Sequence, residues 1–189
     1  MGIRIIIIGI VFAASVFGVP AQNTVDFKHK SLQKALQKYE VPSVEHLREI
    51  TLSDSLIKTH AVNGKFFRIV DDPEATILFV YVGRVLSCRA GGCSINGNKN
   101  HDGDSEYFDY FMFFDPDKTV RLVKVFNYQA THGQEVTARG WLRQFAGFDG
   151  TDNLDVGKNI DAISGATISV NALTFDVQEK TGILQRMKW

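Results

Sequence analysis

The chain has 189 residues, of which 44% are apolar, including 14 Phe, so it can bury one sizeable hydrophobic core. Its 21 basic residues balance its 21 acidic residues. Because there is no basic excess to attract nucleic acid phosphates or anionic lipid, the composition argues against both of these partners. A small molecule or another protein is the expected binding partner.

Residues 1–21 have the pattern of a secretory signal peptide. Arg4 precedes an apolar run, Ile5 to Val19, and Val19 and Ala21 occupy the small-residue positions before the expected cleavage point. The run has 15 residues, whereas a membrane-spanning helix needs about 20, which favours a cleaved signal over a retained anchor. We therefore expect an exported protein, periplasmic or otherwise extracytoplasmic, with no integral membrane span after cleavage.

Two cysteines, Cys88 and Cys93, enclose a short segment that contains two glycines. An even number of cysteines in an exported chain predicts a disulfide between them. A redox-active dithiol is less favoured because the spacing is not the tight C-x-x-C arrangement. The polar segment that follows carries His101, Asp102 and Asp104, which we interpret as a solvated loop, with cation binding as the minor alternative, so no metal site is predicted.

Residues 22–60 are predicted to form a helical lead-in. Residues 26–39 place one apolar face at helical spacing, made of Leu32, Ala35, Leu36 and Tyr39. A second helix is predicted after Ser43, with Val44, Leu47 and Ile50 on one face. We interpret both helices as packing elements without a chemical role.

From Gly64 the pattern changes from helices to strands. Successive segments rich in β-formers predict four strands: Lys65–Val70, Thr76–Leu86, Tyr107–Phe114 and Thr119–Tyr128. The last two flank the turn sequence Asp115-Pro116-Asp117-Lys118, in which proline sets φ at the second position, so they predict a β-hairpin.

The last part of the chain is predicted to be helical again. A short helix is expected at Arg139–Ala146, then a Gly- and Asp-rich loop at Gly147–Gly157, then a final helix with a stripe at Val170, Leu173 and Val177. Strands and helices in this irregular order predict an α+β fold, an antiparallel sheet with flanking helices. We assign residues 64–189 to this single domain.

The segment that suggests chemistry runs from Asp161 to Thr167, with the sequence D-A-I-S-G-A-T. A helix that begins here would offer unpaired N–H groups and a positive dipole end to a phosphate, and Thr167 would supply a hydroxyl for a phosphate ester. The alternative is an ordinary helix N-cap made by Ser164 or Thr167. Average residue usage gives the pattern D-x-x-[ST]-G-A-T a chance of roughly four in ten thousand in a chain of this length, which favours a specific role.

This string resembles the flavinylation motif of the FMN-binding domain family, which includes the flavin-bearing subunits of Na⁺-translocating NADH:quinone reductase and of the Rnf complex. The resemblance implies that a flavin transferase cleaves FAD and joins FMN to Thr167 by a phosphoester bond. It further implies that Asp161 helps to position the acceptor or its metal-bound donor. The remaining motif residues, Ser164, Gly165 and Ala166, would line the phosphate site.

An upstream segment is similar to the family's T-P-G-L-G stretch and to its W-x-x-Q-F-x-G pattern. Here Thr131 and Gly133 match, while His132 replaces the proline and Gln134-Glu135 replace Leu-Gly. The second pattern is present as Trp141, Gln144, Phe145 and Gly147. The resemblance thus implies that Thr131, His132 and Gly133 contact the flavin, and His132 either donates to the reduced flavin or is a solvated loop residue.

Together these features predict an exported electron-transfer flavoprotein rather than a free-standing enzyme. Its expected partners are a flavin transferase and a redox protein or membrane electron-transport complex. Two alternatives stay open: a small FMN-dependent reductase, and a secreted binding module in which the motif is vestigial. A thiol-redox protein that uses Cys88 and Cys93 is a more distant alternative.

Overall fold

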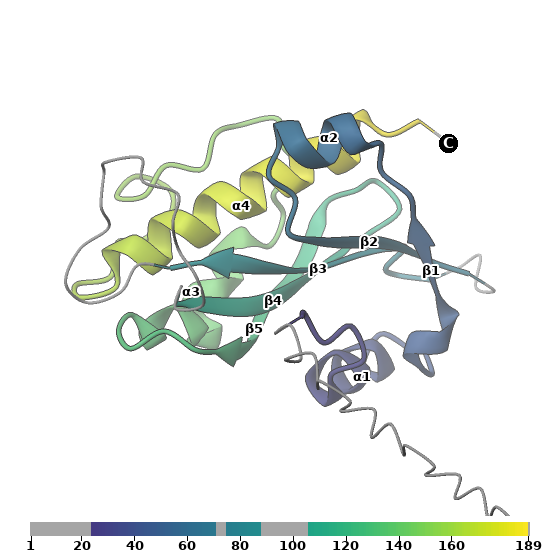
Figure 1. The fold of residues 1–189 in the computed structure, drawn as a ribbon, viewed down its shortest axis with the longest axis horizontal. Coiled ribbons are helices and arrows are strands. Elements are labelled where there is room, and N and C mark those ends of the chain that lie inside the picture. Colours follow the sequence, from purple (N-terminus) through teal and green to yellow (C-terminus); the bar gives the residue numbers. More distant parts are fainter. Residues whose placement is uncertain (1–23, 71–74, 88–105, 189) are drawn as a thin grey trace, which may run out of the picture.

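The structure is a computed structural model that describes residues 24–70, 75–87 and 106–188. Within them, five strands form one antiparallel sheet in the order β1-β2-β3-β4-β5 (Figure 1). The strands are β1 (Leu47–Ile50), β2 (Gly64–Ile69), β3 (Phe79–Leu86), β4 (Tyr107–Phe114) and β5 (Val120–Tyr128). The predicted α+β fold and the predicted hairpin are both confirmed. The predictions for residues 1–21, the two cysteines and the segment around His101 lie outside the described residues.

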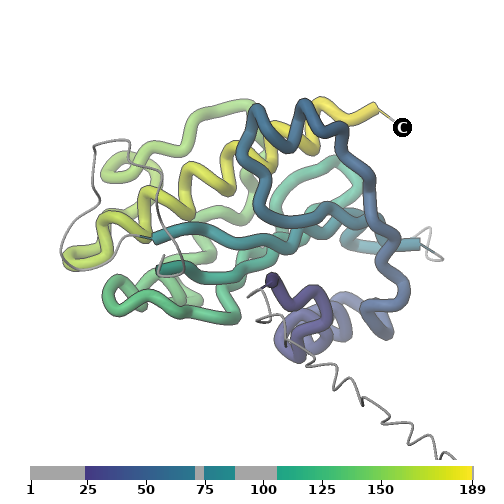
Figure 2. Tube along the Cα trace, in the orientation of Figure 1, coloured from purple at the N-terminus to yellow at the C-terminus, as the bar shows by residue number. Residues whose placement is uncertain are grey.

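Helices cover both faces of this sheet. Helix α1 (Lys30–Gln37) lies on one face and the long helix α4 (Thr167–Arg186) crosses the other (Figure 2). Alternate residues of β4 point to opposite sides, so Phe111 packs with the α1 core and Tyr110 with the α4 core. The near-continuous apolar sequence of β4 follows from this position, because a central strand is buried on both faces.

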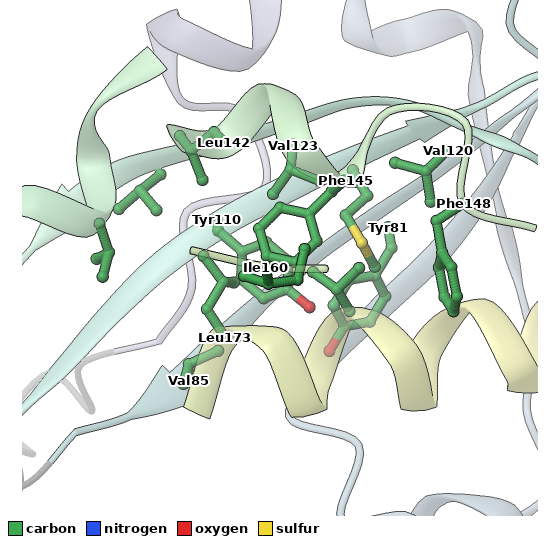
Figure 3. Close-up of a cluster of buried hydrophobic side chains, with 14 of the residues drawn as sticks. Tyr81, Val85, Tyr110, Val120, Val123, Leu142, Phe145, Phe148, Ile160 and Leu173 are labelled. Atoms are coloured by element: carbon green, nitrogen blue, oxygen red, sulfur yellow. The ribbon is translucent and has the colours of Figure 1, made fainter. Parts of the chain in front are cut away.

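The core beneath α4 is the larger of the two. Its helix stripe, Val170, Leu173 and Val177, is fully buried, as its spacing predicts. Figure 3 shows Leu173 from α4 facing side chains of the sheet, with Phe145 and Ile160 from the connecting segment packed among them. The segment between β5 and α4 is therefore part of the core, and it contains η2 (Gln134–Thr137), α3 (Arg139–Leu142) and η3 (Arg143–Phe145).

The prediction of a second helix after Ser43 is wrong. A single 3₁₀ turn, η1 (Val44–His46), is followed by β1, which pairs with β2 so that Leu47 lies opposite Ile69 and Ile50 opposite Phe66. Leu47 packs on the α1 side of the sheet and Ile50 on the α4 side. Pairing with β2 thus overrides the helix-like spacing, and the lead-in contributes the edge strand of the sheet as well as α1 and α2 (Asp54–Thr59). In the described parts of the chain, no helix is both long and apolar enough to cross a bilayer.

Candidate functional site

The loop before α4 is held in place by two side chains of the α3–η3 segment. The indole Nε1 of Trp141 donates to the carbonyl oxygen of Asp161 at 2.8 Å, and Oε1 of Gln144 accepts from the Asp161 N–H at 2.8 Å. Trp141 is itself buried and meets the ring of Phe145 edge-on. Trp141 and Gln144 therefore bind the backbone carbonyl and the backbone N–H of Asp161, the first residue of the motif.

Helix α4 begins without a side-chain cap. Its N-cap residue is Ala166, whose N–H donates to the Ile163 carbonyl oxygen at 3.1 Å and whose carbonyl accepts the first intrahelical bond, from Val170, at 2.9 Å. In the described part of the chain, neither the Ser164 nor the Thr167 side chain makes a capping hydrogen bond, which contradicts the ordinary N-cap interpretation. The N–H groups of residues 167–169 precede the first intrahelical bond, so they have no intrahelical acceptor.

Thr167 is an exposed residue of the motif. Thr167, Ser164 and Gly165 are exposed, whereas Ala166 is buried and fixes the helix start to the core. Gly165 has φ +82°, and nothing lies within 4 Å of the place where a Cβ would stand. This glycine allows the turn into α4 and leaves open space where its own side chain would stand.

Thr167 lines an open pocket of about 260 Å³. Three distant parts of the chain line it: the end of β3, the loop after β5, and the start of α4. The lining residues are Ser87, His132, Gly133, Gly165, Ala166, Thr167, Ile168 and Ser169. The structure thus brings five of the eight predicted cofactor-binding residues into one pocket.

The other three predicted residues lie beside the pocket rather than in its lining. Thr131 Oγ1 donates to Oε1 of the buried Glu106. Asp161 and Ser164 are exposed on the loop that leads to the pocket, with the Asp161 backbone held as described above. These residues shape the approach to Thr167 instead of touching the space in front of it.

Three hydroxyl groups that no sequence pattern indicated lie at the pocket, where Ser87 and Ser169 belong to its lining and Tyr128 lies next to them. Ser169, only 2% exposed, has its Oγ 3.1 Å from Ser87 Oγ and 3.1 Å from the Tyr128 hydroxyl. The Tyr128 hydroxyl donates to the His132 carbonyl oxygen at 2.5 Å. Ser87 and Tyr128 are 82 and 41 residues from Ser169 in the sequence, so no local pattern pointed to this cluster.

The pocket offers hydrogen-bond donors but little charge. Among the described residues that line it, His132 is the one side chain that can become a cation, and neither lysine nor arginine takes part. The positive end of the α4 dipole and its free N–H groups are the main attraction for an anion. Burial raises the pKa of the Tyr128 phenol, and its hydrogen bond with Ser169 opposes this shift. Tyr128 therefore keeps its proton at neutral pH.

Comparison with known proteins agrees with this geometry. Residues 106–179 match the family model described as FMN-binding domain, a shorter span than the predicted 64–189 that includes β4, β5, the α3–η3 segment and the first part of α4. No curated protein and no solved structure shows significant similarity to the chain. Residues 106–179 are therefore similar to the FMN-binding domain family, which indicates a flavin-binding protein.

Proposed function

We propose that this protein is an exported electron-transfer flavoprotein that carries FMN covalently on the Thr167 hydroxyl through a phosphoester bond. One observation supports the attachment site above all. Thr167 lies within the segment matched to the FMN-binding domain family, yet this exposed residue lines a pocket and its side chain does not cap the helix that it begins. Such a hydroxyl is available for bond formation.

The residues around Thr167 fit a phosphate group. The N–H groups of residues 167–169 have no intrahelical acceptor and would donate to its oxygens. Gly165 leaves open space on one side, and His132 lines the pocket with ring nitrogens that can donate to an anion. A phosphodiester carries a single negative charge, which the positive end of the helix dipole would favour.

Attachment would break the phosphoanhydride bond of FAD and form a phosphoester bond to Thr167. The Thr167 oxygen forms a bond to the phosphorus on the riboflavin side of FAD, the bond from that phosphorus to AMP breaks, and the threonine proton leaves to solvent or a base. A flavin transferase would supply the catalysis, so this chain needs only to present the hydroxyl. Bound FMN supplies the redox chemistry that amino-acid side chains lack, while the surrounding protein sets its exposure.

Covalent attachment suits the predicted export. A protein outside the cytoplasm that loses a free cofactor cannot readily recapture it, and residues 1–21 have the features of a signal peptide. The redox partner is proposed to be another protein or a membrane electron-transport complex.

The attachment site can be tested by substituting Thr167→Val and producing the protein together with a flavin transferase. The wild type should gain the mass of FMN less one water and fluoresce after denaturing electrophoresis, and the variant should do neither. Thr59→Val, on the exposed side of α2, is the matched control and should keep its flavin. Covalent flavin in the Thr167→Val protein would disprove the assignment. The same intact mass also reports whether residues 1–21 are removed.

A further inference from the structure

The hydroxyl groups of Ser87, Ser169 and Tyr128 at the pocket form a chain of hydrogen bonds. It runs from Ser87 to Ser169 at 3.1 Å, from Ser169 to Tyr128 at 3.1 Å, and from Tyr128 to the His132 carbonyl at 2.5 Å. Ser87 and Ser169 both line the pocket, and Ser169, in the middle of the chain, is the more deeply buried of the two. The chain therefore connects the pocket to a backbone carbonyl through three hydroxyl groups.

The direction of this chain follows from the chemistry of its last member. A carbonyl oxygen can only accept, so Tyr128 must donate its single proton to the His132 carbonyl. Tyr128 then accepts from Ser169, and Ser169, having donated its own proton, accepts from Ser87. The protons of all three hydroxyls are thus committed along the chain, and that of Ser87 points to Ser169.

Ser87 consequently differs from an ordinary serine in a binding site. Its proton is committed to Ser169, and within the described chain no donor contacts its oxygen, whose remaining lone pair is available at the pocket. A phosphate oxygen, which only accepts, gains nothing from this group. A ligand hydroxyl, which can donate, does.

We propose that Ser87 is a specificity-determining residue of the flavin site, whose hydroxyl oxygen accepts a hydrogen bond from a hydroxyl group of the ribityl chain. This assignment rests on the proposed attachment of FMN to Thr167. The ribityl hydroxyls are the donors nearest to the phosphate, and Ser87 and Thr167 line the same pocket. The pocket would then combine two kinds of group, N–H donors for the phosphate and an oriented acceptor for the polyol.

The experiment compares Ser87→Ala, Ser87→Thr and the control Ser55→Ala, which lies on the exposed side of α2. Each protein is loaded covalently from FAD by a flavin transferase, loading is checked by mass, and time-resolved fluorescence anisotropy measures the fraction of flavin that rotates locally. Loss of one neutral hydrogen bond should raise the ratio of mobile to fixed flavin about 2- to 10-fold in Ser87→Ala. Ser87→Thr retains the oxygen and should resemble the wild type, as should Ser55→Ala.

A second arm uses FAD analogues that lack the 2′-, 3′- or 4′-hydroxyl of the ribityl chain. One analogue should raise the mobile fraction of the wild type as much as Ser87→Ala does, and combining it with Ser87→Ala should add nothing further. The assignment is overturned if Ser87→Ala leaves the flavin as fixed as in the wild type. It is also overturned if the effect of Ser87→Ala adds to the effect of each of the three analogues, tested one at a time. A wild-type protein without covalent flavin would instead refute the proposed function, and this assignment with it.

Discussion

At the scale of single residues, Gly133 shows how closely the two halves of the pocket approach. Its φ is +85°, and a Cβ there would lie 2.7 Å from Ser169 Oγ and 3.2 Å from Ser169 Cβ. A side chain would therefore meet two obstacles, a strained backbone and a contact with the buried start of α4. Gly165 shares the positive φ but has open space around it. A substitution at Gly165 would therefore introduce backbone strain alone, whereas a substitution at Gly133 would introduce backbone strain and a steric clash.

We predict that alanine substitutions at three glycines will lower stability in a fixed order. Gly133→Ala should cost about 2–4 kcal/mol from strain and overlap together, and Gly165→Ala about 1–2 kcal/mol from strain. Gly140→Ala, in α3 with nothing near its Cβ, should be neutral or stabilising by up to about 1 kcal/mol. Urea unfolding of the three proteins measures the order, and equal losses at Gly133 and Gly165 would contradict the close packing on Ser169.

At the scale of elements, the α3–η3 segment positions the motif without lining the pocket. Trp141 and Gln144 bind the carbonyl and the N–H of Asp161, and Phe145 anchors the segment in the core. The loop from Asp161 to Ala166 therefore begins from a fixed peptide and ends at a buried N-cap. This arrangement explains physically why the two patterns occur together in one chain, although neither side chain touches the pocket.

Replacement of Gln144 tests this positioning role. Gln144→Leu removes the acceptor for the Asp161 N–H, so amide hydrogen exchange at Asp161 should accelerate about 2- to 10-fold, the value of one neutral hydrogen bond. Gln144→Glu keeps an acceptor oxygen in a side chain of the same length and should exchange like the wild type. Exchange followed by NMR gives both rates, and equal protection in the leucine variant would show that the loop is held by other contacts.

At the scale of the whole molecule, a buried polar cluster lies where α4 crosses the sheet. The Tyr110 hydroxyl donates to Asp176 Oδ2 at 2.5 Å, and Lys180, 1% exposed, pairs with Asp176 Oδ1 at 2.6 Å. Tyr81 lies beside Tyr110, and among the described residues its buried hydroxyl has no hydrogen-bond partner. Burial, and then the charge of Asp176, raises the pKa of both tyrosines well above the ordinary value.

These shifts predict a loss of stability in alkaline solution. The folded protein keeps both phenol protons, whereas the unfolded chain releases them near pH 10, so the stabilisation is complete below that pH and is lost as the pH rises towards the folded pKa values. Each tyrosine should contribute about 1.4 kcal/mol per pH unit. The measurement is the free energy of unfolding against pH between about 9 and 11.

The two tyrosine-to-phenylalanine variants are matched for this test. Tyr81 and Tyr110 together steepen the fall of the unfolding free energy with pH above about pH 10. Each variant should remove about half of this added slope. At neutral pH, Tyr81→Phe should be neutral or stabilising by about 1 kcal/mol because it removes an unpaired buried hydroxyl. Tyr110→Phe should cost about 1–3 kcal/mol because Asp176 loses a donor. An unchanged slope in both variants would show that other groups govern the alkaline response.

Local patterns in the sequence determined much of the fold. The strands on either side of Asp115–Lys118, the helical stripe of α4 and the position of the motif at that helix's start were all predictable, because each depends on residues close in sequence. The same kind of pattern misled at Leu47 and Ile50, where a four-residue strand has the spacing of a helix face. A segment this short takes its conformation from its neighbour, here β2.

The sequence by itself determined that Thr167 stands in a flavinylation-like motif at a helix start, since that information is contiguous. Only the tertiary structure decided what surrounds it. Ser87, Tyr128 and Ser169 meet because β3 and β5 end, and α4 begins, at the same edge of the molecule. Hydrogen bonds between residues this far apart in the chain depend on the order of the strands and on where the helix crosses the sheet. The residues that make these bonds show no periodic pattern in the sequence.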